Sequence, residues 1–124
     1  MMKGDTLVLP ELRQRVLDAS FEWASFRPGV DIHRLYGDGE GDTQGGASAA
    51  LLRYAPGAIV PRHQHQGYEH IFVLHGTQID ERGTHVSGTL VVNPPGSTHE
   101  VRSPDGCVVL AIWERPNVFS SSSA

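Results

Sequence analysis

Glycine and proline divide this chain into short apolar pieces, and their spacing limits the folds that it can adopt. The 124 residues include 14 glycines and 8 prolines. The pieces between them are rich in Val, Ile, Leu, Tyr and Phe, which favour strands over helices. Short strands separated by turn signals are typical of an antiparallel sandwich or barrel, so we predict an all-β fold. The predicted strands are residues 29–36, 47–54, 58–63, 68–75, 78–81, 90–93, 98–102 and 107–114.

A chain of this length is expected to form one domain, and we find no internal repeat in it. Residues 1–28 should be an N-terminal arm that packs on the barrel or on a dimer partner. Residues 29–117 should form the barrel, and 118–124 a disordered serine-rich tail. The helix-like stretch is 11–18, although it lacks a clear apolar stripe. Residues 38–46 read as a solvated hairpin loop, because they lack the glycine and terminal glutamate of a calcium-binding EF-hand.

The charge of the chain argues against a nucleic-acid partner. Its formal net charge is −4, its isoelectric point is about 5.9, and Lys3 is its single lysine. The arginines are scattered, so no basic stripe could neutralise phosphates.

The N-terminus lacks the apolar core of a signal peptide, and no stretch is long and apolar enough to cross a membrane. We therefore expect a cytoplasmic protein without membrane attachment. The single cysteine, Cys107, excludes an intrachain disulfide and any C-x-x-C motif, and its apolar surroundings predict a small buried side chain.

A group of histidines and one glutamate predicts a metal site. His63 and His65 are two residues apart, so on an extended strand both side chains leave the same face. Glu69 follows a plausible turn and can return beside them, while His99 comes from a later segment. Imidazoles and a carboxylate in this arrangement resemble the 2-His-1-carboxylate pattern of metal sites with open positions.

The other candidate residues carry weaker signals. By alternation Arg62, Gln64 and Glu100 should point away from the metal. His33, His70, His75 and His85 lie outside the ligand pattern and are expected to be packing or surface residues. Arg53, Gln78 and Trp113 could line the pocket, although one sequence does not determine which way they face. No residue stands out as a general base.

The segment 68–75 also predicts a covered outer face. If Glu69 faces the interior, Ile71 and Val73 join it, and Phe72 and Leu74 face outward. Large apolar groups in a row rarely stay in contact with water, so the N-terminal segment or a second subunit should cover them. We expect a homodimer.

The spacing around these residues resembles the first cupin motif. Gly57 is followed after five residues by His63-x-His65, then after three residues by Glu69 and after six by Gly76. This resemblance implies a double-stranded β-helix, a small jelly-roll barrel whose interior holds the metal.

A second stretch resembles the second cupin motif. Gly88 is followed after five residues by Pro94-x-Gly96 and after two more by His99, while Ser103 stands where the motif usually closes with Asn. The closing residue is not a metal ligand in that family. The family's ligands therefore fall on His63, His65, Glu69 and His99.

Flanking stretches are similar to the cupin-like domain of ChrR-type anti-sigma factors and to small cupins of the acetylacetone dioxygenase type. They include WASFRPGVDIHRLY, HQHQGYEHIFVLHGTQIDERG and NPPGSTHEVRSPDGC. The N-terminal zinc-binding helical domain of the anti-sigma factors has no counterpart in this sequence.

This resemblance implies one divalent metal ion, Fe²⁺ or Zn²⁺ first, with Mn²⁺, Ni²⁺ or Co²⁺ as alternatives. The first functional hypothesis is an Fe²⁺-dependent dioxygenase-like enzyme that acts on a small dicarbonyl or hydroxyketone in the barrel. The second is a ChrR-like zinc-binding sensor or ligand-binding module without catalytic activity, since four protein ligands make a closed zinc site. A metal-free, storage-type cupin is the third.

Overall fold

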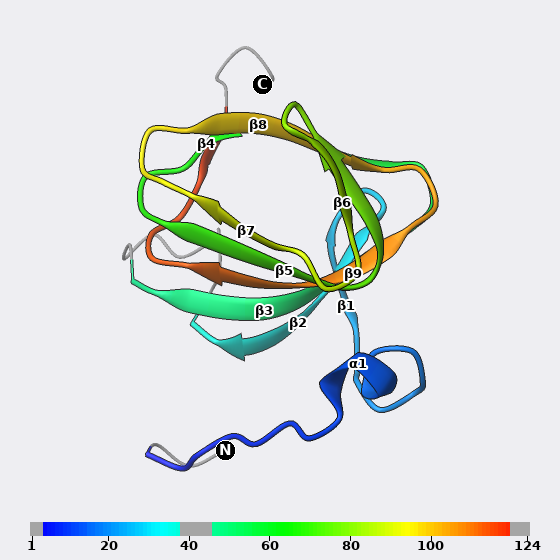
Figure 1. The fold of residues 1–124 in the computed structure, drawn as a ribbon. Helices are drawn as coiled ribbons and strands as arrows, with labels where there is room; N and C mark the ends of the chain where they lie inside the picture. The colour runs from blue at the N-terminus through cyan, green and yellow to red at the C-terminus, as the bar shows by residue number, and fades with distance from the viewer. Residues whose placement is uncertain (1–3, 38–45, 120–124) are drawn as a thin grey trace.

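The computed structural model describes residues 4–37 and 46–119, and within them ten strands curl into a barrel (Figure 1). The predicted loop at 38–46 therefore falls almost entirely outside the described residues. One short helix, α1, precedes the strands. The elements are α1 (Leu12–Arg15), β1 (Ala24–Arg27), β2 (Val30–Tyr36), β3 (Ser48–Tyr54), β4 (Ala58–Gln64), β5 (Glu69–Asp80), β6 (Gly83–Val86), β7 (Leu90–Asn93), β8 (Thr98–Ser103), β9 (Cys107–Trp113) and β10 (Val118–Phe119).

The longest strand, β5, joins the two walls of the barrel. The order of hydrogen-bonded neighbours is β1-β2-β3-β9-β5-β8-β4-β10, with β6 and β7 also paired to β5, and every pairing is antiparallel. The first half of β5 lies between β7 and β9, whereas its second half pairs with β6 and β8. This arrangement is the jelly-roll barrel of cupins, so the predicted fold class is confirmed.

A β-bulge in the middle of β5 reverses which residues face the interior. Val73 pairs with Val109, but the next pair joins His75 to Val108, so one extra residue lies on β5. Before the bulge odd-numbered residues such as Ile71 and Val73 are buried in the interior cluster. After the bulge the even-numbered Gln78 and Asp80 are the buried ones. A bulge has this effect because side chains alternate with a period of two.

A second bulge in β4 turns His63 inward. Val60 pairs with Val101 and His63 with His99, so β4 has one more residue than β8 over this interval. The extra residue falls at Pro61–Arg62. Proline has no N–H to give to a ladder, and a bulge is one of the few places in a sheet that accepts it.

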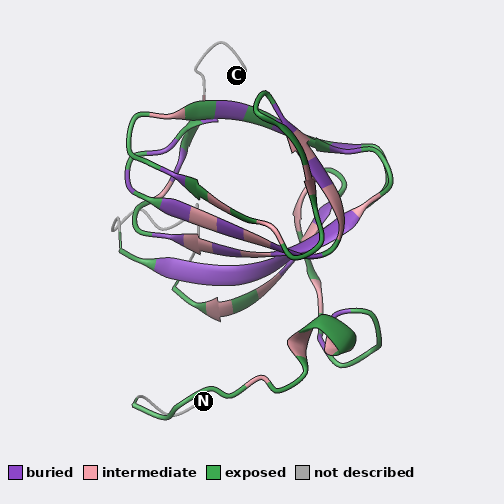
Figure 2. Ribbon diagram, viewed as in Figure 1, coloured by how far each residue is buried: buried purple, intermediate pink, exposed green. Residues whose placement is uncertain are grey.

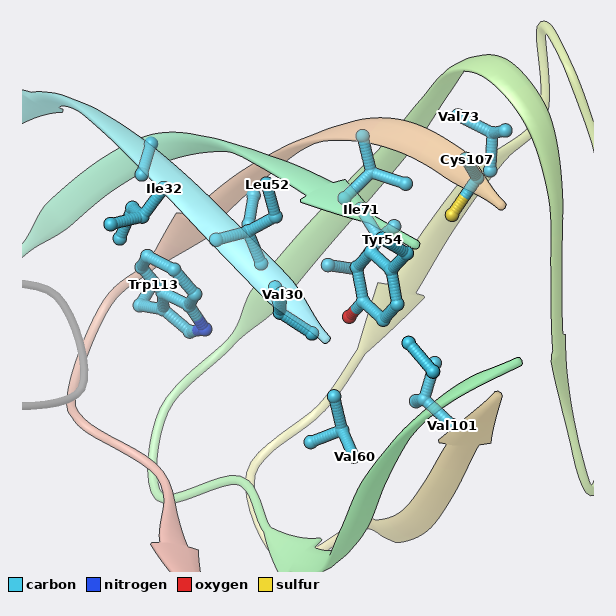
Figure 3. Packing of buried hydrophobic residues seen from close by; sticks show 14 residues of the cluster. Val30, Ile32, Leu52, Tyr54, Val60, Ile71, Val73, Val101, Cys107 and Trp113 are labelled. Carbon is cyan, nitrogen blue, oxygen red and sulfur yellow. The ribbon is translucent and has the colours of Figure 1, made fainter. Parts of the chain in front are cut away.

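The interior of the barrel is apolar over most of its length. Figure 3 shows the side chains of this cluster directed toward one another from several strands. In Figure 2 buried and exposed residues alternate along β8, as expected when one face of a sheet forms the core, whereas β3 is buried along almost its whole length. The labelled members are Val30, Ile32, Leu52, Tyr54, Val60, Ile71, Val73, Val101, Cys107 and Trp113.

The N-terminal arm lies outside the barrel and packs on its outer face. Val16 and Phe21 form a second buried cluster with three sheet residues, Leu51, Leu74 and Val108. Phe72 packs against this cluster and is partly buried. The outward side chains of β5 are thus covered at least in part by the arm, which was one of the two covers expected from the sequence.

The strands differ from the prediction in two respects. Residues 68–75 and 78–81 were expected as two strands, but they form the single strand β5, because Gly76 continues the strand at a positive φ. Strands β1, β6 and β10 were not expected. Since β1 and β10 lie outside 29–117, the sheet extends into the residues assigned to the arm and to the tail, while 120–124 lie outside the described residues.

The helix is also shorter than the stretch 11–18 that was predicted, because α1 spans only Leu12–Arg15. Among the described residues, no helix is long and apolar enough to span a membrane.

The crowding around Gly76 gives a stability prediction. A Cβ there would lie 2.3 Å from the Gly106 carbonyl oxygen and 2.8 Å from Cys107 Cα, and φ is +79°. Gly57 has a similar φ of +87° but open space around its Cβ position. We expect Gly57→Ala to lower the free energy of unfolding by about 1–2 kcal/mol. Gly76→Ala should cost roughly 1–3 kcal/mol more, because it adds a backbone clash.

Urea unfolding of the two variants measures this difference directly. Equal losses in the two variants would contradict the close packing of β5 against the turn before β9.

Candidate metal centre

Four buried side chains converge inside the barrel from three neighbouring segments. They are His63 of β4, His65 just after it, Glu69 at the start of β5 and His99 of β8. One candidate ligand atom from each lies within 4.8 Å of all the others. The antiparallel register makes His63 and His99 direct partners across β4 and β8. The group that was expected from the spacing is therefore brought together by the fold.

The turn between β7 and β8 holds His65 in place. The backbone N–H of His65 donates to the Ser97 carbonyl over 2.9 Å, and its own carbonyl accepts from the Gly96 N–H over 2.7 Å. Gly96 has a φ of +90°, which suits glycine best. This turn also starts the strand that carries His99, so one loop positions two imidazoles.

Hydrogen bonds fix the tautomers of His63 and His65. Nδ1 of His63 lies 2.8 Å from the Pro61 carbonyl oxygen, which can only accept, so Nδ1 carries the proton. Nδ1 of His65 lies 2.8 Å from Ser97 Oγ. That hydroxyl donates its own proton to the Pro94 carbonyl over 2.7 Å, so it must accept from His65. In both rings Nε2 is left as the atom with a free lone pair.

A hydrogen bond to Asp80 fixes the tautomer of His99. Its Oδ2 accepts from Nδ1 of His99 over 3.1 Å, while its Oδ1 accepts from Nε2 of His85 and from the Arg82 N–H, each over 2.9 Å. Burial alone raises the pKa of Asp80, but the hydrogen bonds from His99 and His85 outweigh it and lower the pKa. An ionised carboxylate on Nδ1 is the partner that metal-binding histidines commonly have.

The unprotonated Nε2 atoms of the three histidines suit a bound cation. Nε2 of His65 is buried and makes no hydrogen bond of acceptable geometry with any described residue. Nε2 of His63 and Nε2 of His99 face each other at 3.0 Å, although neither carries the proton. Unprotonated nitrogens so close together repel each other unless a positive charge lies between them. The donors of this cluster therefore suit a divalent metal ion.

Glu69 is held with one oxygen toward the histidines. Its Oε2 accepts from Trp113 Nε1 over 2.7 Å and from Asn117 Nδ2 over 3.2 Å. Its Oε1 accepts from Asn93 Nδ2 over 3.1 Å and lies 2.9 Å from Nε2 of His65. Since Oε2 is already occupied by two donors, Oε1 is the oxygen available to a metal.

The charge states of the cluster follow from burial and proximity. Burial lowers the pKa of His63 to about 4 and also lowers the pKa of His99. Burial alone raises the pKa of Glu69, but the polar contact with His65 and the nearby imidazoles lower it to about 2. At neutral pH these groups therefore supply neutral imidazoles and an anionic carboxylate, which are the forms that bind metals.

A small cavity of about 20 Å³ adjoins the cluster inside the barrel. Its walls are mainly apolar, and Gln78 and Tyr54 add polar groups. Arg27 closes one side, where its guanidinium lies 4.2 Å from the ring centroid of Phe119. The lining residues are Phe26, Arg27, Val30, Leu52, Tyr54, Val60, His63, Glu69, Ile71, Gln78, His99, Val101 and Trp113. Gln78 and Trp113, whose facing the sequence left open, both lie on the inside.

Other polar residues lie away from the cluster, as alternation indicates. Arg62 and Gln64 are exposed, and Arg62 forms an ion pair with Glu81. Glu100 and His75 are also exposed.

Arg53, a candidate for the pocket wall, instead lies on the outer surface. Its guanidinium pairs with Asp31 over 2.8 Å and lies 4.5 Å from the ring centroid of Trp23. His33 is likewise outside the site, packed against Phe21, with its Nδ1 2.8 Å from the Glu22 carbonyl oxygen.

Sequence reasoning missed the residues that support the ligands. The β5 bulge hides Asp80, since alternation counted from Glu69 would place it outward. Asn93 directly precedes the rigid turn at Pro94, and this position is the sequence signal that could have identified Asn93. Asn117 lies at the edge of the predicted barrel and carried no signal.

The family model of the ChrR cupin-like domain matches residues 13–116. This chain belongs to that family. No curated protein matches its sequence.

Solved structures share the fold of this chain. A crystal structure of Rhodobacter sphaeroides SigE in complex with the anti-sigma ChrR matches with 28% identity and a TM-score of 0.62, over 73% of this chain and 47% of that chain. A protein of unknown function with a cupin-like fold from Ralstonia eutropha matches with 24% identity and a TM-score of 0.65, over 76% of this chain and 60% of that one. The present chain thus spans about half to three fifths of these relatives.

An acetylacetone dioxygenase from Acinetobacter johnsonii shares the fold. Its structure matches with a TM-score of 0.72 and 12% identity, over 100% of this chain and 83% of that chain.

The hydrogen bond from His99 to Asp80 predicts a change in metal affinity. Asp80→Asn keeps the shape of the side chain but removes the charge that makes His99 a better donor, so we expect metal affinity to fall roughly 10- to 100-fold. Glu81→Gln is the matched control, since Glu81 is the next residue and its carboxylate pairs with the exposed Arg62.

Competition with a chromophoric chelator measures both affinities. Equal affinities for Asp80→Asn and Glu81→Gln would show that the carboxylate does not support the site.

Proposed function

We propose that this chain is a cytoplasmic metal-dependent enzyme of the dioxygenase type, acting on a small dicarbonyl or hydroxyketone. In this proposal His63, His65 and His99 bind one divalent ion through Nε2, and Glu69 is an additional ligand through Oε1. Fe²⁺ is the metal that suits this chemistry, with Mn²⁺, Ni²⁺ or Co²⁺ as alternatives.

The observation that carries the proposal is the position of the cavity. His63, Glu69 and His99 belong both to the ligand cluster and to the cavity wall, so a metal held there would face enclosed space. The lining of this small cavity has the composition of a small-molecule site, with apolar walls and a few polar groups that fix orientation. A purely structural metal site would need no such space beside it.

A bound divalent ion would supply Lewis-acid polarisation of chelating substrate oxygens and, as iron, reactivity toward dioxygen. The apolar wall would keep bulk water away from the reacting carbons. Trp113, Asn93 and Asn117 would hold the Glu69 carboxylate in one orientation. Beyond the ligand cluster, the described wall residues include no carboxylate, imidazole or lysine. That composition suits chemistry that does not depend on a separate general base.

A zinc-binding sensor is the second candidate, and the family match favours it. The structure that contains the anti-sigma ChrR is 28% identical to this chain over the aligned part. Four protein donors within 4.8 Å of one another are enough for a closed tetrahedral zinc site, and closed sites are structural. Such a module would bind a ligand or a regulatory protein without turnover.

Metal content and oxygen uptake separate the two candidates. We expect untagged protein from its native host to contain near-stoichiometric iron or another open-site metal, and the iron-loaded protein to consume oxygen with acetylacetone or a hydroxyketone. His99→Ala should lose the metal and the uptake, whereas His75→Ala, on the exposed side of β5, should keep both.

Near-stoichiometric zinc, together with no oxygen uptake across a panel of diketones and hydroxyketones, would contradict the enzyme and favour the sensor.

We further propose that the protein is a homodimer formed through the outer face of β5 and β7. Apolar side chains remain exposed beside the arm, with Tyr68 at 48%, Leu90 at 56% and Val92 at 47% exposure. Among the described residues β7 pairs only with β5, so its other edge is open. An open apolar edge of this kind favours association with a second copy.

A charge on this face should disrupt the dimer. Val92→Glu is expected to shift the protein to a monomeric mass in light scattering at micromolar concentration, because a buried unpaired carboxylate opposes association. Ile59→Glu, a similarly exposed position on β4, is the control and should leave the dimer intact. A monomeric mass for the unmodified protein would contradict the proposed dimer.

A further inference from the structure

Gln78 is a buried polar residue whose side chain has no hydrogen-bond partner among the described residues. It lies on the second half of β5 and is 2% exposed. Its backbone is opposite His85 in the ladder with β6. The side-chain amide makes no hydrogen bond with any described residue, unlike the neighbouring Asp80, which makes three. Leaving a buried amide unpaired is costly, so native proteins rarely do it without a functional reason.

The amide lies at the cavity beside the metal cluster. Gln78 shares the cavity wall with His63 and His99. The bulge in β5 places it on the inner face, two residues before the carboxylate that holds His99. Much of the wall around it is aliphatic, as at Ile71 and Val101. Because no hydrogen bond joins the amide to a described wall residue, a group that occupies the cavity is the partner left to it.

We propose that Gln78 recognises a hydroxyl group of the molecule that binds the metal. A primary amide presents an acceptor and two N–H donors side by side, and a hydroxyl, which both donates and accepts, can satisfy both halves. The inference rests on the proposed function. It narrows the substrate class to a small, mostly apolar compound with metal-chelating oxygens at one end and a hydroxyl at the other.

Two probes that differ by one hydroxyl test this assignment. Propanohydroxamic acid and 3-hydroxypropanohydroxamic acid both chelate metals through the hydroxamate, and the second adds a remote hydroxyl. Binding to the Co²⁺-loaded protein is followed by the visible absorption of the metal. We expect the native protein to bind the hydroxylated probe at least about tenfold more tightly, as one well-made hydrogen bond allows.

Gln78→Met and Gln78→Leu remove the amide while filling the same space. Each variant should abolish the preference. The affinity for the hydroxylated probe should fall about tenfold, and the affinity for the other probe should change less than about twofold. Gln64→Leu is the matched control, because Gln64 is exposed, lies between two ligands in sequence and should leave both affinities unchanged.

Thermal unfolding of the metal-free protein gives a second readout that does not depend on activity. Because the amide is buried without a partner, both Gln78 variants should raise the melting temperature. If both variants lower it, the amide already has a partner in the protein and the assignment is overturned.

The remaining outcomes separate this inference from the proposed function. If the native protein binds the two probes equally, or if the variants lose affinity for both probes equally, the role of Gln78 is overturned and the enzyme proposal stands. Failure of the native protein to bind either probe overturns both. A hydroxyl preference that depends on Gln78, in a protein that consumes no oxygen with any diketone or hydroxyketone, supports the inference and overturns the dioxygenase.

Discussion

Three hydrogen bonds to oxygen acceptors fix the tautomers of the three imidazoles, and the chemistry of the site depends on these hydrogen bonds. The Pro61 carbonyl, the Ser97 hydroxyl and the Asp80 carboxylate each accept a hydrogen bond from the Nδ1–H of one histidine. Each acceptor comes from a different irregularity of the barrel: the bulge in β4, the turn before β8 and the half of β5 beyond its bulge. The irregular parts of the sheet therefore make three Nε2 lone pairs converge, and regular strands alone would not.

Three members of the cluster could be grouped from local spacing, whereas His99 joined them through the resemblance to the second cupin motif. His63-x-His65 on an extended segment and Glu69 after a turn require no knowledge of distant pairing. Asp80 and Gln78 could not be predicted in the same way, because the bulge in β5 shifts the alternation between Val73 and His75. A bulge is set by how two strands align across the sheet, and one sequence does not reveal that register.

The two proposed functions differ in how Glu69 would take part in metal binding. The same side chains, among them His63, Glu69 and His99, form the donor cluster and one end of the cavity. If Glu69 stays bound to its three N–H donors and remains a weak ligand, the metal keeps room for substrate. If its Oε1 closes the coordination sphere, the site becomes a structural zinc site. The difference between the two sites depends on the Glu69 carboxylate, which accepts hydrogen bonds from Trp113 and two asparagines.

The most direct test of the account is the coordination of the native metal, measured by X-ray absorption spectroscopy on protein purified from its host. The account predicts one metal per chain with three imidazole nitrogens at about 2.0–2.1 Å. These imidazole signals should disappear together with the metal in His99→Ala. A metal with one imidazole ligand or none, or a metal that survives this substitution with its spectrum unchanged, would contradict the convergence of the three Nε2 atoms on a single ion.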